Sequence, residues 1–243
     1  MKLTDFEIAT YERGDEEADR VAIVLPGRLD TKDYVHMTSL VDYLADLGFY
    51  ALSFDPPGTW ESSGDISTYS TTSILDVTDE IIHRLGSKPT VLLGHSRGGT
   101  HALLSGAMNP AVTHMVAIMS SSGPTNYGIP KKGSTKHSTR DLPPGTGRTV
   151  GRRTFELPYA YFEDQATYDA LPALKTSSKP KLFVYGTQDT LVRPETVVAI
   201  YDASAAPKVL RAIDTEHDYR LHPDAIKQVN TVVGKFLKDY EAI

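Results

Sequence analysis

The chain has 243 residues, no cysteine and a formal net charge of −6 at pH 7. This length fits one large α/β domain or two small ones, with a sizeable buried core. Without cysteine, disulfides, thiol catalysis and cysteine-ligated zinc or iron–sulfur centres are excluded, and the net negative charge gives no overall reason to expect nucleic-acid binding. The charged N-terminal stretch does not resemble a secretory signal, and no apolar run approaches the roughly 18 to 20 residues that span a bilayer. A cytoplasmic protein is therefore expected.

Short apolar runs rich in β-branched residues alternate along the chain with stretches of helical period. This alternation is typical of a mostly parallel sheet flanked by helices. Phe6–Tyr11 predicts an antiparallel edge strand, because its apolar and polar residues alternate. The predicted central strands are Val21–Leu25, Tyr50–Phe54, Thr90–Leu93, His114–Met119, Lys181–Tyr185 and Lys208–Ile213. Helices are predicted at about 34–47, 72–85, 98–108, 194–203 and 223–240.

The alternation stops between about residues 124 and 179, where prolines and glycines are frequent. Because long segments of this kind are usually lids or binding elements, we expect a cap insertion at 124–179 within a single domain, 1–243. Residues 128–153 hold one acid, Asp141, and seven basic residues: Lys131, Lys132, Lys136, Arg140, Arg148, Arg152 and Arg153. These cations either form a solvated surface or attract anionic substrates.

The sequence GHSRGG, residues 94–99, lies between a predicted strand and a predicted helix. G-x-S-x-G in this setting is typical of a nucleophile elbow, a sharp turn that exposes a serine hydroxyl above the carboxyl ends of the strands. The sharpness predicts strained backbone angles at Ser96, and it requires glycine at 94 and 98 with Gly99 relieving further crowding. A glycine-rich turn without catalytic function is the alternative.

A serine hydroxyl becomes a strong nucleophile when a base takes its proton and an acid orients that base. Around a nucleophile elbow, the acid and then the histidine follow the serine in the chain, each after a later strand. Asp189 follows the predicted strand Lys181–Tyr185, and His217 follows Lys208–Ile213. Both residues therefore have the required place.

These features resemble the α/β-hydrolase superfamily of serine hydrolases over nearly the whole chain. GHSRGG resembles the family's elbow, GTQDTLVRP its acid loop, and His217 its histidine ahead of the C-terminal helix. The resemblance implies an α/β-hydrolase fold, a mostly parallel central sheet flanked by helices, with the cap insertion after the sixth strand. It also implies catalytic Ser96, Asp189 and His217, with no cofactor.

The resemblance also implies an oxyanion hole made of two backbone N–H groups. One is that of Arg97, and the other is that of Arg28 in the loop Pro26-Gly27-Arg28, where the family usually carries His-Gly-x. The side chains of Arg28, Trp60, Tyr159 and Tyr161 are candidate substrate contacts. A solvated loop arginine is the alternative for Arg28, and ordinary core packing is the alternative for the tyrosines.

Other titratable residues fit the triad less well. His95 is expected to pack or hydrogen-bond beneath the nucleophile, and His222 to cap the last helix or face solvent. Asp214 and Asp218 would reach His217 only with awkward local geometry. Asp55 lies in FDPPGTWESSGD, which resembles the family's pocket-shaping loop. No His, Asp and Glu group has convincing metal-ligand spacing, so no metal is expected.

The sequence therefore predicts a serine hydrolase that cleaves a carboxylic ester through a covalent acyl-enzyme. A thioesterase, an amidase or peptidase, and a carbon–carbon bond hydrolase share this machinery, and the fold does not separate them. A non-catalytic small-ligand sensor is a further alternative. The expected partner is a small-molecule ester, anionic if the basic residues of the insertion attract it, with neither nucleic acid nor a membrane span.

Overall fold

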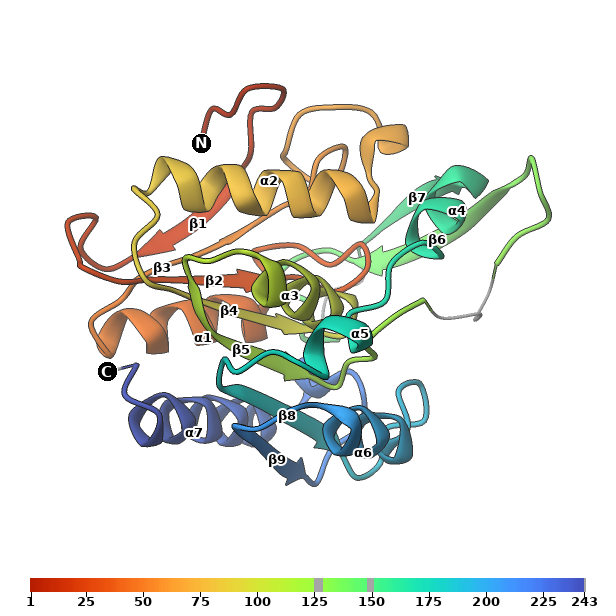
Figure 1. Ribbon diagram of the computed structural model, residues 1–243. Coiled ribbons are helices and arrows are strands. Elements are labelled where there is room, and N and C mark those ends of the chain that lie inside the picture. Colours follow the sequence, from red (N-terminus) through yellow and green to blue (C-terminus); the bar gives the residue numbers. More distant parts are fainter. Residues whose placement is uncertain (125–128, 148–150, 243) are drawn as a thin grey trace.

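The computed structural model describes residues 1–124, 129–147 and 151–242. A seven-stranded sheet lies at its centre, in the order β1-β3-β2-β4-β5-β8-β9 (Figure 1). β1 runs antiparallel to β3, and all other neighbouring strands are parallel. The strands are β1 (Thr10–Arg13), β2 (Val21–Leu25), β3 (Tyr50–Phe54), β4 (Thr90–His95), β5 (Val112–Ile118), β8 (Lys181–Gly186) and β9 (Lys208–Ile213).

Helices cover both faces of the sheet (Figure 1). The long helices are α1 (Val35–Asp46), α2 (Thr71–Arg84), α3 (Arg97–Met108), α6 (Pro194–Ala203) and α7 (Pro223–Asp239). Alternate strand residues enter two separate cores: Ile23 belongs to a cluster that includes side chains of α2, α3 and α6, whereas Val24 belongs to one that includes side chains of α1 and α7. Because both faces are buried, the central strands read as continuous apolar runs rather than alternating ones.

The predicted central strands and helices are all present, within about two residues at each end. The predicted edge strand is antiparallel, but it begins at Thr10 instead of Phe6. The backbone before Thr10 is used differently, because the amides of Glu7 and Ala9 donate to the hydroxyls of Ser63 and Ser62, at 2.8 and 2.9 Å. These two backbone amides are therefore bonded to the loop after β3 instead of to a neighbouring strand, and β1 does not extend back to Phe6.

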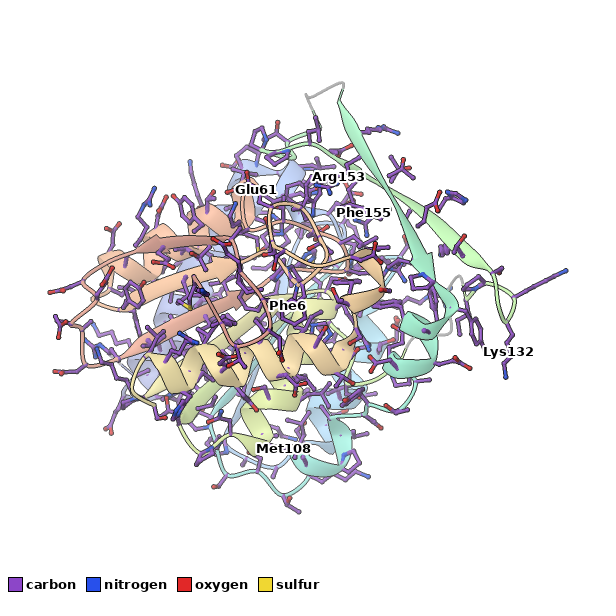
Figure 2. The ribbon with its side chains drawn as sticks, turned by 90° about the horizontal axis from the view of Figure 1, so that it is seen from above. Phe6, Glu61, Met108, Lys132, Arg153 and Phe155 are labelled. Atoms are coloured by element: carbon purple, nitrogen blue, oxygen red, sulfur yellow. The ribbon has the colours of Figure 1, made fainter. Side chains whose placement is uncertain are left out.

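The segment 124–179 contains an antiparallel hairpin, β6 (Thr135–Asp141) and β7 (Arg152–Pro158), followed by the short helices α4 (Tyr159–Gln165) and α5 (Leu171–Leu174). It follows β5, the fifth strand in chain order and not the sixth, because only β1 precedes β2 in the chain. The hairpin extends beyond the body of the protein, with Lys132 at its periphery (Figure 2). Arg148 and the other residues of 125–128 and 148–150 lie outside the described residues.

Side chains from β7 and α4 anchor this segment to the domain. Phe155, Leu157, Tyr161 and Phe162 form a buried cluster with Leu29, Tyr69 and Ile74. The segment therefore rests on the loop after β2 and on the start of α2. Across the described ranges, no helix combines the length and the apolar composition needed to cross a bilayer.

Candidate active site

Ser96 lies in the turn between β4 and α3, with a φ of 53° and a ψ of −124°. Few residues other than glycine adopt a positive φ. A Cβ added to Gly94 would lie 2.2 Å from the carbonyl carbon of Gly98, and one added to Gly98 would lie 2.0 Å from the carbonyl oxygen of Leu25. One added to Gly99 would lie 2.6 Å from the Cβ of Ser120. The predicted strained turn and its need for glycines are confirmed.

The turn places Ser96 beside two residues from the last strands of the sheet. His217, after β9, has Nε2 2.8 Å from the Oγ of Ser96 and Nδ1 2.7 Å from Oδ2 of Asp189. Asp189, after β8, has a fully buried side chain, and its Oδ1 accepts the amides of Leu191 and Val192 at 2.8 Å each. The two amides fix the carboxylate, so its second oxygen is aimed at the imidazole. This hydrogen-bonded chain can move a proton from the serine hydroxyl to the histidine.

His95 lies beneath this group, as expected. Burial lowers its pKa well below the usual value, and the charge of a protonated His217 would lower it further. Its Nε2 lies 3.0 Å from the carbonyl oxygen of His217. Since a carbonyl oxygen only accepts, neutral His95 carries its proton on Nε2 and donates it there. The contact holds the backbone of the loop that carries His217.

The loop after β2 lies against Ser96, because a Cβ added to Gly27 would be 3.4 Å from the Cβ of Ser96. Three side chains hold this loop. The Leu29 amide donates to Tyr69 Oη at 3.0 Å, and the indole N–H of Trp60 donates to the Leu29 carbonyl at 2.9 Å. Arg140 donates twice to the carbonyl of Arg28, at 3.1 and 2.6 Å. Leu29 itself has a φ of 60°, so these bonds hold a strained backbone.

Two backbone N–H groups near Ser96 remain candidates for the oxyanion hole. The Arg97 amide is at the first position of α3, where helix geometry provides no intrahelical acceptor. Within the described ranges, the Arg28 amide donates to neither a backbone nor a side-chain acceptor. Both groups are therefore free to donate to an oxygen in the space above Ser96.

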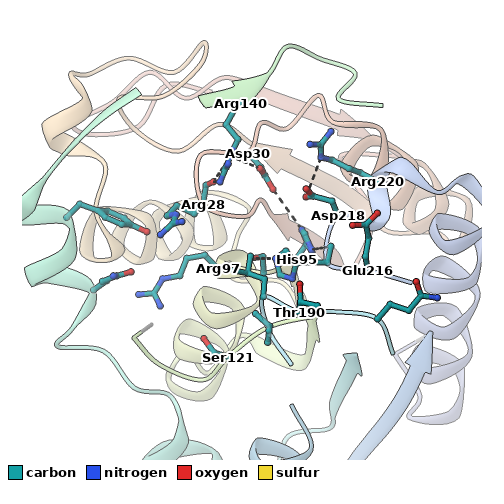
Figure 3. A pocket seen from close by; sticks show the side chains of 17 residues that line it. Arg28, Asp30, His95, Arg97, Ser121, Arg140, Thr190, Glu216, Asp218 and Arg220 are labelled. Atoms are coloured by element: carbon teal, nitrogen blue, oxygen red, sulfur yellow. Dashed lines mark hydrogen bonds and ion pairs between the residues drawn. The ribbon is translucent and has the colours of Figure 1, made fainter. Parts of the chain in front are cut away.

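That space is a cavity of about 590 Å³ lined by residues from both the sheet edge and the insertion (Figure 3). Of the predicted substrate contacts, Arg28 and Tyr161 line it, whereas Trp60 and Tyr159 do not. The indole of Trp60 instead packs between Tyr34 and Phe155, with ring centroids 6.1 and 5.4 Å away. Tyr159 lies two positions before Tyr161 on α4, a rotation of about 200°, which turns it to the opposite side of the helix. The structure therefore places neither Trp60 nor Tyr159 on the wall of this cavity.

The remaining acids and the second histidine contact other groups. Nε2 of His222 pairs with Oε1 of Glu216 at 2.8 Å, near the surface. Asp214 accepts hydrogen bonds from Thr187 and Gln188, at 2.6 and 2.9 Å.

Asp218 and Asp55 also contact groups other than His217. Asp218 lies 3.6 Å from the guanidinium of Arg220. Asp55 is buried and accepts the Lys32 amide at 2.9 Å. Each of these carboxylates therefore has a structural partner, and the imidazole of His217 pairs with Asp189.

Two groups within the described ranges bring together side chains that can ligate a metal, which spacing in the sequence did not reveal. They are Asp30, His36 and His95, and Asp33, Asp55 and Glu61. In the second, the ammonium of Lys32 lies 2.6 Å from Asp33 and 2.6 Å from Glu61, so a protein cation already fills the group. In the first, Arg140 pairs with Asp30 at 3.3 Å, which disfavours a further cation.

Several residues of the site have no clear signal in the sequence. Tyr69 holds the loop after β2, yet it lies in a polar stretch with no motif around it. In the sequence, Arg140 counted only as one basic residue of the insertion. Among the basic residues of 128–153 that the structure describes, however, only Arg140 lines the cavity. Arg220 also lines the cavity, and it follows His217 too closely to be separated from it by pattern.

Comparisons with known proteins agree with this architecture. The model of the alpha/beta hydrolase fold family matches residues 22–144, half of the chain. The chain belongs to this family, and the predicted fold class is confirmed. A lysophosphatidylserine lipase from Danio rerio is 33% identical over 89 residues, which are 36% of this chain and 23% of that protein. The chain thus matches less than a quarter of the length of that relative.

Solved structures share the whole fold at low sequence identity. Est1E from Butyrivibrio proteoclasticus, with ferulic acid bound, superposes with a TM-score of 0.80 at 18% identity, covering 100% of this chain and 98% of that one. A monoacylglycerol lipase from Paleococcus ferrophilus gives a TM-score of 0.73 at 18% identity, covering 96% of this chain and 99% of that one. At this identity the likeness shows the fold.

Proposed function

We propose that this chain is a serine hydrolase that cleaves a carboxylic ester of a small molecule. The observation that carries the proposal is the continuous hydrogen bonding from Asp189 through His217 to Ser96, at 2.7 and 2.8 Å, on the wall of a cavity. Esterase chemistry is supported by the names of the similar proteins, which include a lysophosphatidylserine lipase and a monoacylglycerol lipase.

In the proposed reaction, Oγ of Ser96 attacks the ester carbonyl while Nε2 of His217 takes its proton. Asp189 holds the imidazole by its Nδ1–H and stabilises the imidazolium. The negative oxygen that forms receives hydrogen bonds from the Arg28 and Arg97 amides. His217 then gives its proton to the leaving alcohol, and the acyl-enzyme remains. Water, deprotonated by His217, attacks this acyl-enzyme and releases the acid and free Ser96.

We further propose that residues 124–179 act as a cap over this site. Tyr161, Gln165 and Arg140 all come from this segment and line the cavity. Because they lie on a hairpin and a helix anchored by a buried cluster, the cap shapes the cavity rather than covering it loosely.

A fluorophosphonate probe tests the proposal directly, because it reacts with an activated serine. We expect one probe per chain, located at Ser96, and turnover of p-nitrophenyl esters. Ser96→Ala should abolish labelling and lower turnover about 10⁴-fold or more while the fold is retained. His217→Ala should be comparably damaging, whereas the surface variant His222→Ala serves as the matched control.

A matched thioester and amide series separates ester hydrolysis from the other acyl-transfer activities. The ester proposal predicts the highest kcat/KM for the oxygen ester at equal acyl length. Ligand binding without labelling or turnover across a broad ester panel would favour a sensor over an enzyme.

A further inference from the structure

The cavity next to Ser96 has an uneven distribution of charge. Four arginines line it: Arg28, Arg97, Arg140 and Arg220. Arg140 pairs with Asp30 at 3.3 Å, and Arg220 pairs with Asp141 at 3.0 Å. Within the described ranges, the other two arginines form no ion pair with a carboxylate. Two of the four arginines that line the cavity therefore have no carboxylate of the described residues within ion-pair distance.

Arg97 is the more buried of these two, with 6% of its surface exposed. Its Nη1 donates to the Gly123 carbonyl at 3.0 Å and its Nη2 to Thr71 Oγ1 at 3.2 Å, both neutral acceptors, while Nε has no partner. Burial lowers the pKa of the guanidinium and the charge of Arg28 lowers it further, whereas the charge of Asp164, which forms no ion pair with it, acts in the opposite direction. A buried cation with only neutral partners is costly in free energy, so an anion that binds there gains more than at an exposed arginine.

Arg28 approaches the same place from the loop after β2. Its Nε is buried and has no hydrogen-bond partner. Arg28, Arg97 and the buried Tyr161 all line the same cavity. Figure 3 shows both guanidinium groups on one side of the cavity, opposite Glu216 and Asp218. The basic side therefore lies away from the loop that carries His217.

This placement assigns the two halves of an ester to the two sides of the cavity. The leaving alcohol must lie near His217, which donates a proton to it in the proposed mechanism. The acyl chain then extends toward Arg28 and Arg97. Resting on the proposed hydrolase function, we propose that Arg28 and Arg97 form an anion-binding subsite for a carboxylate at the far end of the acyl chain, so that the substrates are monoesters of dicarboxylic acids.

Kinetics on matched esters test the subsite. Mono-p-nitrophenyl adipate and p-nitrophenyl hexanoate have acyl chains of equal length, and only the first has a terminal carboxylate. We expect kcat/KM, corrected for uncatalysed hydrolysis, to be at least about tenfold higher for the adipate, since an ion pair in a partly buried site contributes at least that much. Arg97→Gln and Arg28→Gln should each reduce this ratio about tenfold.

The readout is the ratio of kcat/KM for the adipate ester to kcat/KM for the hexanoate ester, because either variant can also disturb the elbow or the adjoining loop and lower both values. The matched control is the double variant Lys131→Gln, Lys132→Gln, which removes two exposed cations of the insertion that do not line the cavity. This control should keep the preference for the adipate. An equal loss of preference in the control would assign the effect to long-range steering and overturn the subsite. A preference for esters that carry the carboxylate on the alcohol, and not on the acyl chain, would also overturn the subsite.

Binding measured without turnover separates this inference from the proposed function. Calorimetry with Ser96→Ala should show adipate binding, weakened at least about tenfold by Arg97→Gln, and tighter than that of hexanoate. Adipate binding without hydrolysis of any ester would sustain the subsite and overturn the hydrolase proposal. Hydrolysis of neutral esters with neither adipate binding nor adipate preference would do the reverse. Tighter competition by inorganic phosphate than by adipate would overturn the carboxylate assignment.

Discussion

Arg140 of the insertion donates two hydrogen bonds to the backbone carbonyl of Arg28, at 3.1 and 2.6 Å, and also pairs with Asp30 at 3.3 Å. These contacts connect the β6 strand to the loop whose amide is proposed to bind the oxyanion. The Arg28 carbonyl shares its planar peptide unit with the Leu29 N–H, which donates to Tyr69, so this peptide is held from both sides directly after the Arg28 amide. The insertion therefore helps to hold the loop that carries the proposed oxyanion donor, as well as forming a wall of the cavity.

Arg140→Gln should lower kcat about tenfold with little change in KM. The loop loses one of the three side chains that hold it, but the proposed nucleophile and base stay in place. The decrease in kcat should therefore be smaller than the 10²–10³-fold decrease that follows loss of an oxyanion donor. Arg140→Lys, with one donor nitrogen in place of two, should be intermediate. Steady-state kinetics with a neutral p-nitrophenyl ester measure this, and Arg152→Gln, an exposed residue of β7, is the control. A rise in KM alone would show that Arg140 contacts substrate instead.

Asp189→Asn should lower kcat by about 10³–10⁴ while the protein keeps its stability. The amide oxygen can still accept the N–H groups of Leu191 and Val192, but the amide nitrogen then faces His217 and favours the wrong tautomer. Asp189→Ala should be as inactive and also less stable, because both backbone donors lose their acceptor. Urea unfolding alongside kinetics distinguishes the two variants. Equal stability of the two would mean that the carboxylate does not anchor its loop.

Gly98→Ala should destabilise the protein by about 3 kcal/mol or more, or prevent folding. The added carbon would meet the Leu25 carbonyl oxygen at 2.0 Å and the Pro26 carbonyl oxygen at 2.5 Å, and backbone atoms cannot turn aside as a flexible side chain can. Gly123→Ala is a suitable control, since the three atoms nearest to its added carbon all belong to the Asp169 side chain, at 3.2 to 3.4 Å. A normal urea midpoint for Gly98→Ala would contradict the tight packing of the elbow against β2.

The stability of the protein should fall as the pH falls below neutrality, and His36 should contribute to this. Burial lowers the pKa of His36 to about 3, against about 6.5 in an unfolded chain. Between these values the unfolded chain binds a proton that the folded chain does not, so unfolding becomes more favourable by up to about 1.4 kcal/mol per pH unit. His36→Phe keeps the ring contacts and should reduce the fall in the free energy of unfolding between pH 7 and 5.

Urea titrations at several pH values measure this slope, with His83→Gln as a control at an exposed histidine at the end of α2. An unchanged slope in His36→Phe would mean that His36 is not neutral in the folded protein. His95 is also buried with a lowered pKa, so part of the slope should remain in the His36 variant.

The central fold could be predicted from the sequence because each buried strand forms a continuous apolar run and each helix carries a 3.6-residue period. The elbow was predictable for a different reason: close packing of backbone on backbone leaves only glycine as a possibility at positions 94 and 98. The places of Asp189 and His217 followed from chain order along a parallel sheet. These signals are all local or depend on strand order.

The parts that could not be predicted depend on contacts between residues distant in sequence. Trp60 was expected at the substrate, but its indole donates to Leu29, 31 residues away. Arg140 could not be separated from the other basic residues of 128–153, since its partner Arg28 lies 112 residues away. The hairpin β6–β7 was missed because its strands are largely exposed and polar, so they lack an apolar pattern.

The three residues of the proposed triad do not have equal structural support. Ser96 follows β4 at the centre of the sheet, whereas His217 follows β9, the edge strand, whose residues are mostly partly exposed. Edge strands with few buried contacts open at a lower free energy than the core. Detachment of β9 would carry the base away from a nucleophile that remains in its strained turn. Heating should therefore inactivate the protein reversibly before the central sheet unfolds. The highest temperature at which the protein is active would then be set by the stability of the edge strand β9 and not by that of the core.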